Sequence, residues 1–130
     1  GDLSHYNSCN VLSLHALLGA YSDEGAQWLD ELRPVLADNI RYACDFIAAH
    51  FPGVQVMQPQ GTYMLFLDCA AWLQEHHMTL RELEERGARA GVIWQDGAAF
   101  AWPDSIRMNL ALPHSRLVEA MERLRVHAFC

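Results

Sequence analysis

Arg107 is the residue of this chain whose surroundings point most clearly to chemistry. It lies between Ile106 and Met108, where apolar and polar residues alternate, so its side chain is expected on the face opposite to its apolar neighbours. A buried guanidinium needs a carboxylate or phosphate to accept its N–H groups, and each such hydrogen bond contributes roughly 1.5–3 kcal/mol. Two interpretations stay open: an internal salt bridge to an acid such as Asp68 or Asp96, or a clamp for the carboxylate of a ligand.

Two glycine-containing segments are candidates for the surroundings of such a site. Gly61 precedes Thr62 and Tyr63 at the entrance to an apolar run, where a glycine lets the backbone approach a ligand and Tyr63 offers a hydroxyl. The alternative is an ordinary tight turn with a packed tyrosine. The segment 96–100 is either a hairpin-type connection or a loop that folds over whatever Arg107 holds.

The pattern of cysteines and histidines argues against a metal centre. The four cysteines, at positions 9, 44, 69 and 130, form no CxxC pair, and the adjacent His76 and His77 do not share a face. Cys44 and Cys69 lie in apolar stretches and are expected to be buried thiols, which fits a reduced, cytoplasmic compartment. No nucleophile, base and acid form a recognisable triad.

Charge and composition exclude several classes of protein. Sixteen acidic and nine basic residues give a net charge of −7, which argues against a nucleic-acid partner. All the basic residues are arginines, so a Schiff base to a carbonyl cofactor, which needs a lysine amine, cannot be formed by this chain alone. The 130 residues, 52% of them hydrophobic, suffice for one domain with a core and an appended arm, and no run approaches the ~18 apolar residues of a membrane helix.

The elements that position these residues begin with two helices. Residues 1–8 are polar and predict an irregular arm, and apolar spacing predicts a helix over 10–21. A longer apolar repeat then runs from Leu29 to Ile47, with a kink or break expected at Pro34 and an end at Pro52-Gly53. The first helix is apolar enough to pack against something outside this chain.

From residue 54 the pattern predicts strands alternating with helices. Strands are expected at 54–57, at 63–69 with both faces buried, at 92–94 and at 106–112. A capping box of Thr79 and Glu82 begins a helix that ends at Ala90, and an amphipathic helix closes the chain. The predicted fold class is α+β, with a small, mainly antiparallel sheet of about three or four strands covered by helices.

The order of several motifs resembles one enzyme family, the pyridoxal-phosphate-dependent class I and II aminotransferases of fold type I. The resemblance is strongest to the carbon–sulfur lyase subgroup of MalY-like and cystathionine β-lyase-like enzymes, and it covers roughly residues 1–125. The motifs that carry it are Ala20-Tyr21…Gly25…Trp28-Leu29…Leu32…Leu36…Asn39, Gly61-Thr62-Tyr63-Met64-Leu65-Phe66-Leu67-Asp68, Ser105-Ile106-Arg107-Met108-Asn109, and Ala111, Pro113, Ser115, Leu117, Ala120, Glu122, Arg123 and Leu124.

This resemblance implies a C-terminal, small domain in which Arg107 pairs with the α-carboxylate of an amino-acid substrate. We therefore expect Arg107, Tyr63, Gly61 and Asn109 to bind substrate, with no catalytic, cofactor-binding or metal-binding residue in this chain. The cofactor, pyridoxal 5′-phosphate, and its lysine would belong to a large domain upstream, and the whole enzyme would be a homodimer. The chain differs from the family pattern in Phe66, where a tryptophan is usual, and in Ala101, where a glycine is usual.

The expected organisation is an N-terminal arm and interdomain helix over 1–21, followed by the small domain over 22–130. The N-terminal helices would pack on the missing large domain. The reaction, β-elimination from a cystathionine-like amino acid or transamination, stays open, as does the substrate's side chain. Two alternatives also stay open: a stand-alone regulatory α+β module in which Arg107 holds an acidic metabolite, and a purely structural Arg107.

Overall fold

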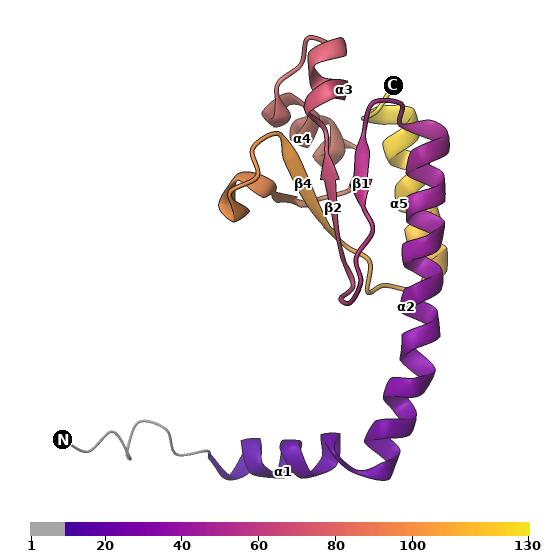
Figure 1. Ribbon diagram of the computed structural model, residues 1–130, viewed down its shortest axis with the longest axis vertical. Helices are drawn as coiled ribbons and strands as arrows, with labels where there is room; N and C mark the ends of the chain where they lie inside the picture. Colours follow the sequence, from indigo (N-terminus) through magenta and orange to yellow (C-terminus); the bar gives the residue numbers. More distant parts are fainter. Residues whose placement is uncertain (1–9) are drawn as a thin grey trace, which may run out of the picture. The chain divides into compact units, whose positions relative to one another are not determined.

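The computed structural model describes residues 10–130, which fall into two compact units. The first unit ends at Pro34, and the second runs from Val35 to Cys130. The expected arm at 1–8 lies outside the described residues. The second unit contains the whole sheet and Arg107 (Figure 1).

Helices α1 (Val11–Ala20) and α2 (Asp23–His50) confirm the two N-terminal helices expected from the apolar spacing. The side chain of Asn10 begins α1 by accepting a 2.8 Å hydrogen bond from the backbone N–H of Ser13. Of the kink or break expected at Pro34, the break is wrong, because α2 continues through this residue. A proline removes only one backbone hydrogen bond, and Ala43, Phe46 and Ile47 keep the later turns of α2 packed in the core.

Four antiparallel strands form the sheet, in the order β1 (Gln55–Met57), β2 (Met64–Asp68), β4 (Ser105–Asn109) and β3 (Gln95–Asp96). The α+β class and the antiparallel sheet are confirmed. The strand expected at 92–94 is wrong, because pairing begins only at Gln95. The N–H of Val92 instead donates to the carbonyl oxygen of Gly87. This hydrogen bond closes the end of the preceding helix, where Gly91 has a φ of +80°.

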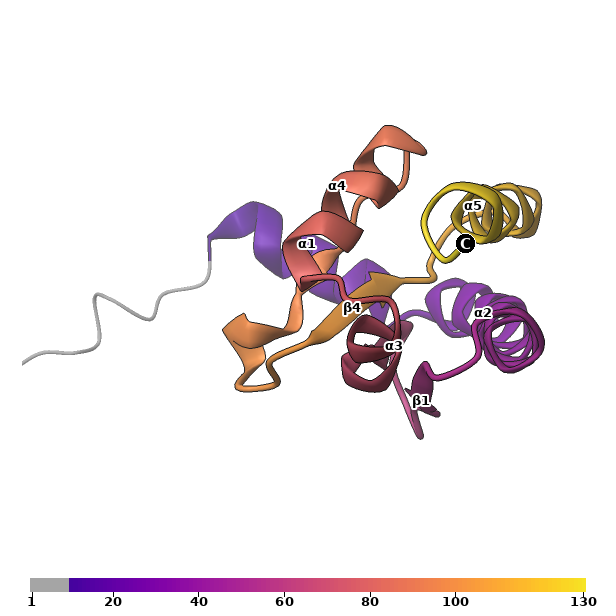
Figure 2. The ribbon, with the colours of Figure 1, turned by 90° about the horizontal axis from the view of Figure 1, so that it is seen from above.

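Three further helices, α3 (Ala70–Glu75), α4 (Leu80–Arg89) and α5 (His114–His127), complete the fold (Figure 2). The capping box of Thr79 and Glu82 is present at the start of α4. The sequence analysis missed α3, a six-residue helix whose N-cap residue, Cys69, makes no side-chain capping hydrogen bond. Such a helix owes its stability to packing, here through Trp72 and Leu73.

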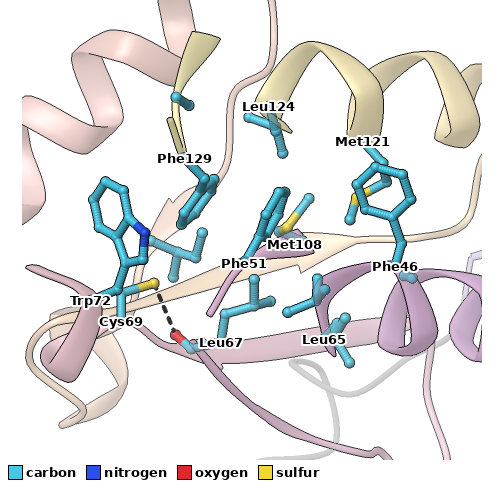
Figure 3. Close-up of a cluster of buried hydrophobic side chains, with 14 of the residues drawn as sticks. Phe46, Phe51, Leu65, Leu67, Cys69, Trp72, Met108, Met121, Leu124 and Phe129 are labelled. Carbon is cyan, nitrogen blue, oxygen red and sulfur yellow. Dashed lines mark hydrogen bonds between the residues drawn. The ribbon is translucent and has the colours of Figure 1, made fainter. Parts of the chain in front are cut away.

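One hydrophobic cluster joins α2, α3, α4 and α5 to one face of the sheet. Leu65 and Leu67 of β2 are fully buried in it, and the rings of Phe51 and Phe129 stack with their centroids 4.3 Å apart (Figure 3). The expectation that β2 is buried on both faces is wrong. Its alternate residues are only partly buried, because α2, α3, α4 and α5 pack on the opposite face.

None of the helices within residues 10–130 combines the length and apolar character needed to cross a membrane.

Candidate functional site

The open face of the sheet carries Arg107 at its centre. Arg107 on β4 lies directly opposite Phe66 of β2 on one side and Gln95 of β3 on the other. Asn109, two residues along β4, lies on the same face and opposite Met64. The alternation predicted from the sequence therefore places Arg107 and Asn109 together, away from the hydrophobic cluster.

The guanidinium of Arg107 has no carboxylate partner among residues 10–130. Its Nε is buried and lacks a hydrogen-bond acceptor. Asp68 instead accepts a 3.0 Å hydrogen bond from the backbone N–H of Ala70, and Asp96 accepts one of 2.7 Å from Ala98. Both acids named as internal partners thus stabilise local turns, and neither pairs with Arg107.

A hollow of about 290 Å³ adjoins this arginine at the edge of the sheet. It is large enough for a small carboxylic acid, since a single water occupies about 30 Å³ in the liquid. Its lining comes from β2, β4, β3 and the segment before β3: Met64, Ile93, Trp94, Gln95, Arg107 and Asn109. Asn109 lines it while its Oδ1 accepts a 2.8 Å hydrogen bond from the N–H of Ala111.

A short turn, η1 (Gly97–Phe100), precedes β4 and contacts it, and it brings the ring of Phe100 onto Arg107. The guanidinium carbon lies 4.1 Å from the centre of that ring. The segment is thus a hairpin-type connection between the antiparallel strands β3 and β4, and its Phe100 contacts Arg107 itself. The sequence analysis did not single out Phe100, because a contact made by a loop residue leaves no periodic signal in the sequence.

The other two expected site residues, Gly61 and Tyr63, lie at the turn between β1 and β2 and do not line the hollow. The residue of this turn with a positive φ is Thr62, at 99°, and a side chain at Gly61 would meet nothing within 4 Å. The carbonyl oxygen of Tyr63 accepts a 2.9 Å hydrogen bond from Leu110, which joins the turn to the end of β4. Met64, Ile93, Trp94 and Gln95 are lining residues that the sequence analysis missed.

Metal-ligating side chains and thiols do not form a second centre in the described part of the chain. Within residues 10–130, no three histidine, cysteine or acidic side chains come together as a metal site. Burial raises the pKa of the Cys69 thiol to about 12, with Asp68 and Asp104 contributing, so this thiol is no nucleophile at neutral pH. Burial also raises the pKa of Cys44.

Comparison with known proteins decides the family. The family model for aminotransferase class I and II matches residues 2–124, nearly the whole chain. The chain belongs to the class I and II aminotransferase family. The open sheet face and its arginine are thus part of an aminotransferase-family fold.

Two curated members of this family are similar to the chain over most of its length. Protein MalY of Escherichia coli K12 is 33% identical over 122 residues, which are 91% of this chain and 30% of MalY. The cystathionine beta-lyase PatB of Bacillus subtilis is 28% identical over 119 residues, which are 89% of this chain and 30% of PatB. The chain therefore spans about 30% of the length of these relatives.

A solved structure of the same family matches the fold. The crystal structure of cystalysin from Treponema denticola, which contains pyridoxal 5′-phosphate, superposes with a TM-score of 0.77 at 28% identity. The match covers 90% of this chain and 29% of cystalysin. The expected α+β architecture is that of a part of such an enzyme.

Proposed function

We propose that this chain is the substrate-carboxylate-binding, C-terminal small domain of a pyridoxal-phosphate-dependent aminotransferase or carbon–sulfur β-lyase that acts on amino acids. The observation that carries the proposal is Arg107, which lies on the open face of the sheet, beside a hollow of about 290 Å³, without an ion-pair partner in residues 10–130. We propose cystathionine-like amino acids as the substrate class, because the similar protein PatB is a cystathionine beta-lyase.

Arg107 would bind the α-carboxylate through two parallel N–H···O hydrogen bonds, which the planar guanidinium matches better than an ammonium does. Asn109 lines the same hollow and would contact the substrate beside it. Tyr63 and Gly61 would approach from the neighbouring turn. With the carboxylate fixed here and the amino group held at the cofactor, the substrate cannot rotate freely about its bonds to Cα. The bond at Cα that must break is therefore held in one orientation.

Pyridoxal 5′-phosphate, when bound to the whole enzyme, supplies the electron sink for the carbanion formed at the substrate's Cα. This chain contains no lysine, so its residues do not fit the covalent attachment of the cofactor. The catalytic lysine and the phosphate-binding groups would come from a large domain encoded upstream. By itself, this chain would be inactive and would contribute binding and orientation of the substrate.

The large domain is also the partner that we propose for the N-terminal helices. Helix α1 buries none of its residues: Leu12 and Leu18 within it expose 80% and 62% of their surface, and Tyr21, directly after it, exposes 85%. Apolar exposure of this extent is typical of a covered interface. Residues 1–21 would thus be an arm and interdomain helix, residues 22–130 the small domain, and the assembled enzyme a cytoplasmic homodimer.

The experiment is a kinetic comparison in the full-length protein loaded with pyridoxal phosphate. Arg107→Ala should raise KM for the amino acid and lower kcat/KM about 30-fold or more, as loss of a buried ion pair costs about 2–5 kcal/mol. Cofactor absorbance should persist. The matched control is Arg125→Ala, which removes an exposed arginine paired with Glu122 on α5 and should leave the kinetics unchanged. Unchanged kinetics in Arg107→Ala would overturn the proposal.

A further inference from the structure

The loop before β4 is held in one conformation by its own hydrogen bonds. Asp96 accepts from Ala98 at 2.7 Å, and the hydroxyl of Ser105 donates to the carbonyl oxygen of Trp102 at 2.7 Å. The N–H of Trp102 donates to the carbonyl oxygen of Gly97 at 3.1 Å. A side chain at Gly97 would collide with Ser105, so the two ends of the loop meet closely. The loop therefore presents Phe100 from a fixed frame.

Phe100 contacts two side chains of the open sheet face. The guanidinium carbon of Arg107 lies 4.1 Å from its ring centre, and the ring of Phe66 meets it edge-on with centroids 5.7 Å apart and planes at 86°. Phe66 is also the cross-strand partner of Arg107. Two aromatic rings thus border the arginine, with Phe66 fixing the ring of Phe100.

No hydrogen bond within residues 10–130 orients the guanidinium of Arg107. Its Nε is buried without an acceptor. A long side chain in this situation has several rotamers, unless packing selects one. The face of an aromatic ring attracts a guanidinium and leaves the N–H groups at its edge free to donate to a carboxylate. Contact with Phe100 is therefore the interaction that can hold Arg107 ready for its ligand.

The ring of Phe100 takes little part in the packing of the domain. Its side chain keeps 44% of its surface exposed and is outside the hydrophobic cluster of the domain. An exposed aromatic ring of this kind contributes little to folding stability. Its replacement by leucine is expected to leave the domain folded and to change mainly the freedom of Arg107.

We propose that Phe100 is a positioning residue for substrate binding: its ring holds the guanidinium of Arg107 in the orientation that receives the substrate's carboxylate. The inference rests on the proposed function, because it assigns Phe100 a role through Arg107. Phe100 thus joins the site from the loop before β4. The next residue, Ala101, is the position where the family pattern usually has a glycine.

The test is steady-state kinetics of the full-length, cofactor-loaded protein. Phe100→Leu should raise KM about threefold to tenfold with a smaller change in kcat, the factor expected for an interaction of this strength. Phe100→Tyr and Phe100→Trp, which keep an aromatic ring face at this position, should have a KM near that of the parent. The matched control is Trp102→Leu, which removes an aromatic side chain from the same loop and should leave KM unchanged.

A double-mutant cycle separates failure of this inference from failure of the proposed function. Phe100→Leu should add no further loss in an Arg107→Ala background, because the group that it positions is gone. If Arg107→Ala raises KM while Phe100→Leu does not, or if the two losses add, the positioning role is wrong and the proposed function stands. If Arg107→Ala itself has no effect, both fail.

Discussion

The side chain of Asn39 on α2 donates a 2.9 Å hydrogen bond to the carbonyl oxygen of Leu110, the residue that follows the strand of Arg107. A second hydrogen bond of 2.9 Å goes to the carbonyl oxygen of Leu112, and the Oδ1 of Asn39 lies 3.0 Å from the Nδ1 of His114. Asn39 is fully buried. One amide therefore satisfies the backbone between β4 and α5 and fixes the end of the strand that positions Arg107.

Replacement of Asn39 by leucine should lower the free energy of unfolding by about 2–4 kcal/mol, because the buried carbonyl oxygen of Leu110 and the partly buried one of Leu112 each lose a hydrogen bond from the amide. Urea denaturation of the purified chain measures this change. The control is Asp38→Asn, which weakens an exposed pair with Arg41 and should cost less than about 0.5 kcal/mol. Equal midpoints for the Asn39→Leu variant and the parent would show that the amide is dispensable.

Ala101 adopts a left-handed conformation, with a φ of 59°, at the end of the turn that carries Phe100. This conformation is strained for alanine and free for glycine, so Ala101→Gly should raise the free energy of unfolding by about 1 kcal/mol. Thermal or urea denaturation measures it. Ala99→Gly, in the same turn without a positive φ, should instead lower it by about 0.5–1 kcal/mol. Two changes of the same sign would contradict the strain at Ala101.

Glu82 accepts hydrogen bonds from the backbone N–H and the hydroxyl of Thr79, each at 2.8 Å, and these lower the pKa of its carboxyl below 4.5. A carboxyl whose pKa is lower in the folded state stabilises the fold above its unfolded pKa, and this contribution is lost as the pH falls through the folded pKa. The stability lost in Glu82→Gln should therefore be present at about pH 6 and shrink toward about pH 3. Denaturation of both proteins across this range tests it, and a constant difference would contradict the cap.

Periodic residues made much of the fold predictable. The alternation of Ile106, Arg107 and Met108 correctly gave the strand, its buried face and the position of the partly buried Arg107 on the opposite face. Thr79 and Glu82 correctly gave the start of α4, because a capping box involves only neighbours along the chain. Local contacts of this kind leave a pattern that the sequence alone displays.

Contacts between distant residues were not predictable in the same way. The position of Phe66 opposite Arg107 depends on strand register, and that of Phe100 above Arg107 depends on the path of a loop. Helix α3 has no capping hydrogen bond from its N-cap residue Cys69 and is held by tertiary packing. The expected strand at 92–94 failed because Val92 completes the end of α4, a contact that competes with the β-forming character of its side chain.

The central claim is that Arg107 binds the carboxylate of an amino-acid substrate. Its most direct test compares kcat/KM for the amino acid with that for the corresponding amine, which lacks the carboxylate, in the full-length, cofactor-loaded protein. The parent should prefer the amino acid by an amount that reflects the ion pair, about 2–5 kcal/mol. Arg107→Ala should lose most of this preference, mainly through a higher KM for the amino acid. An undiminished preference in Arg107→Ala would show that another group binds the carboxylate and would contradict the claim.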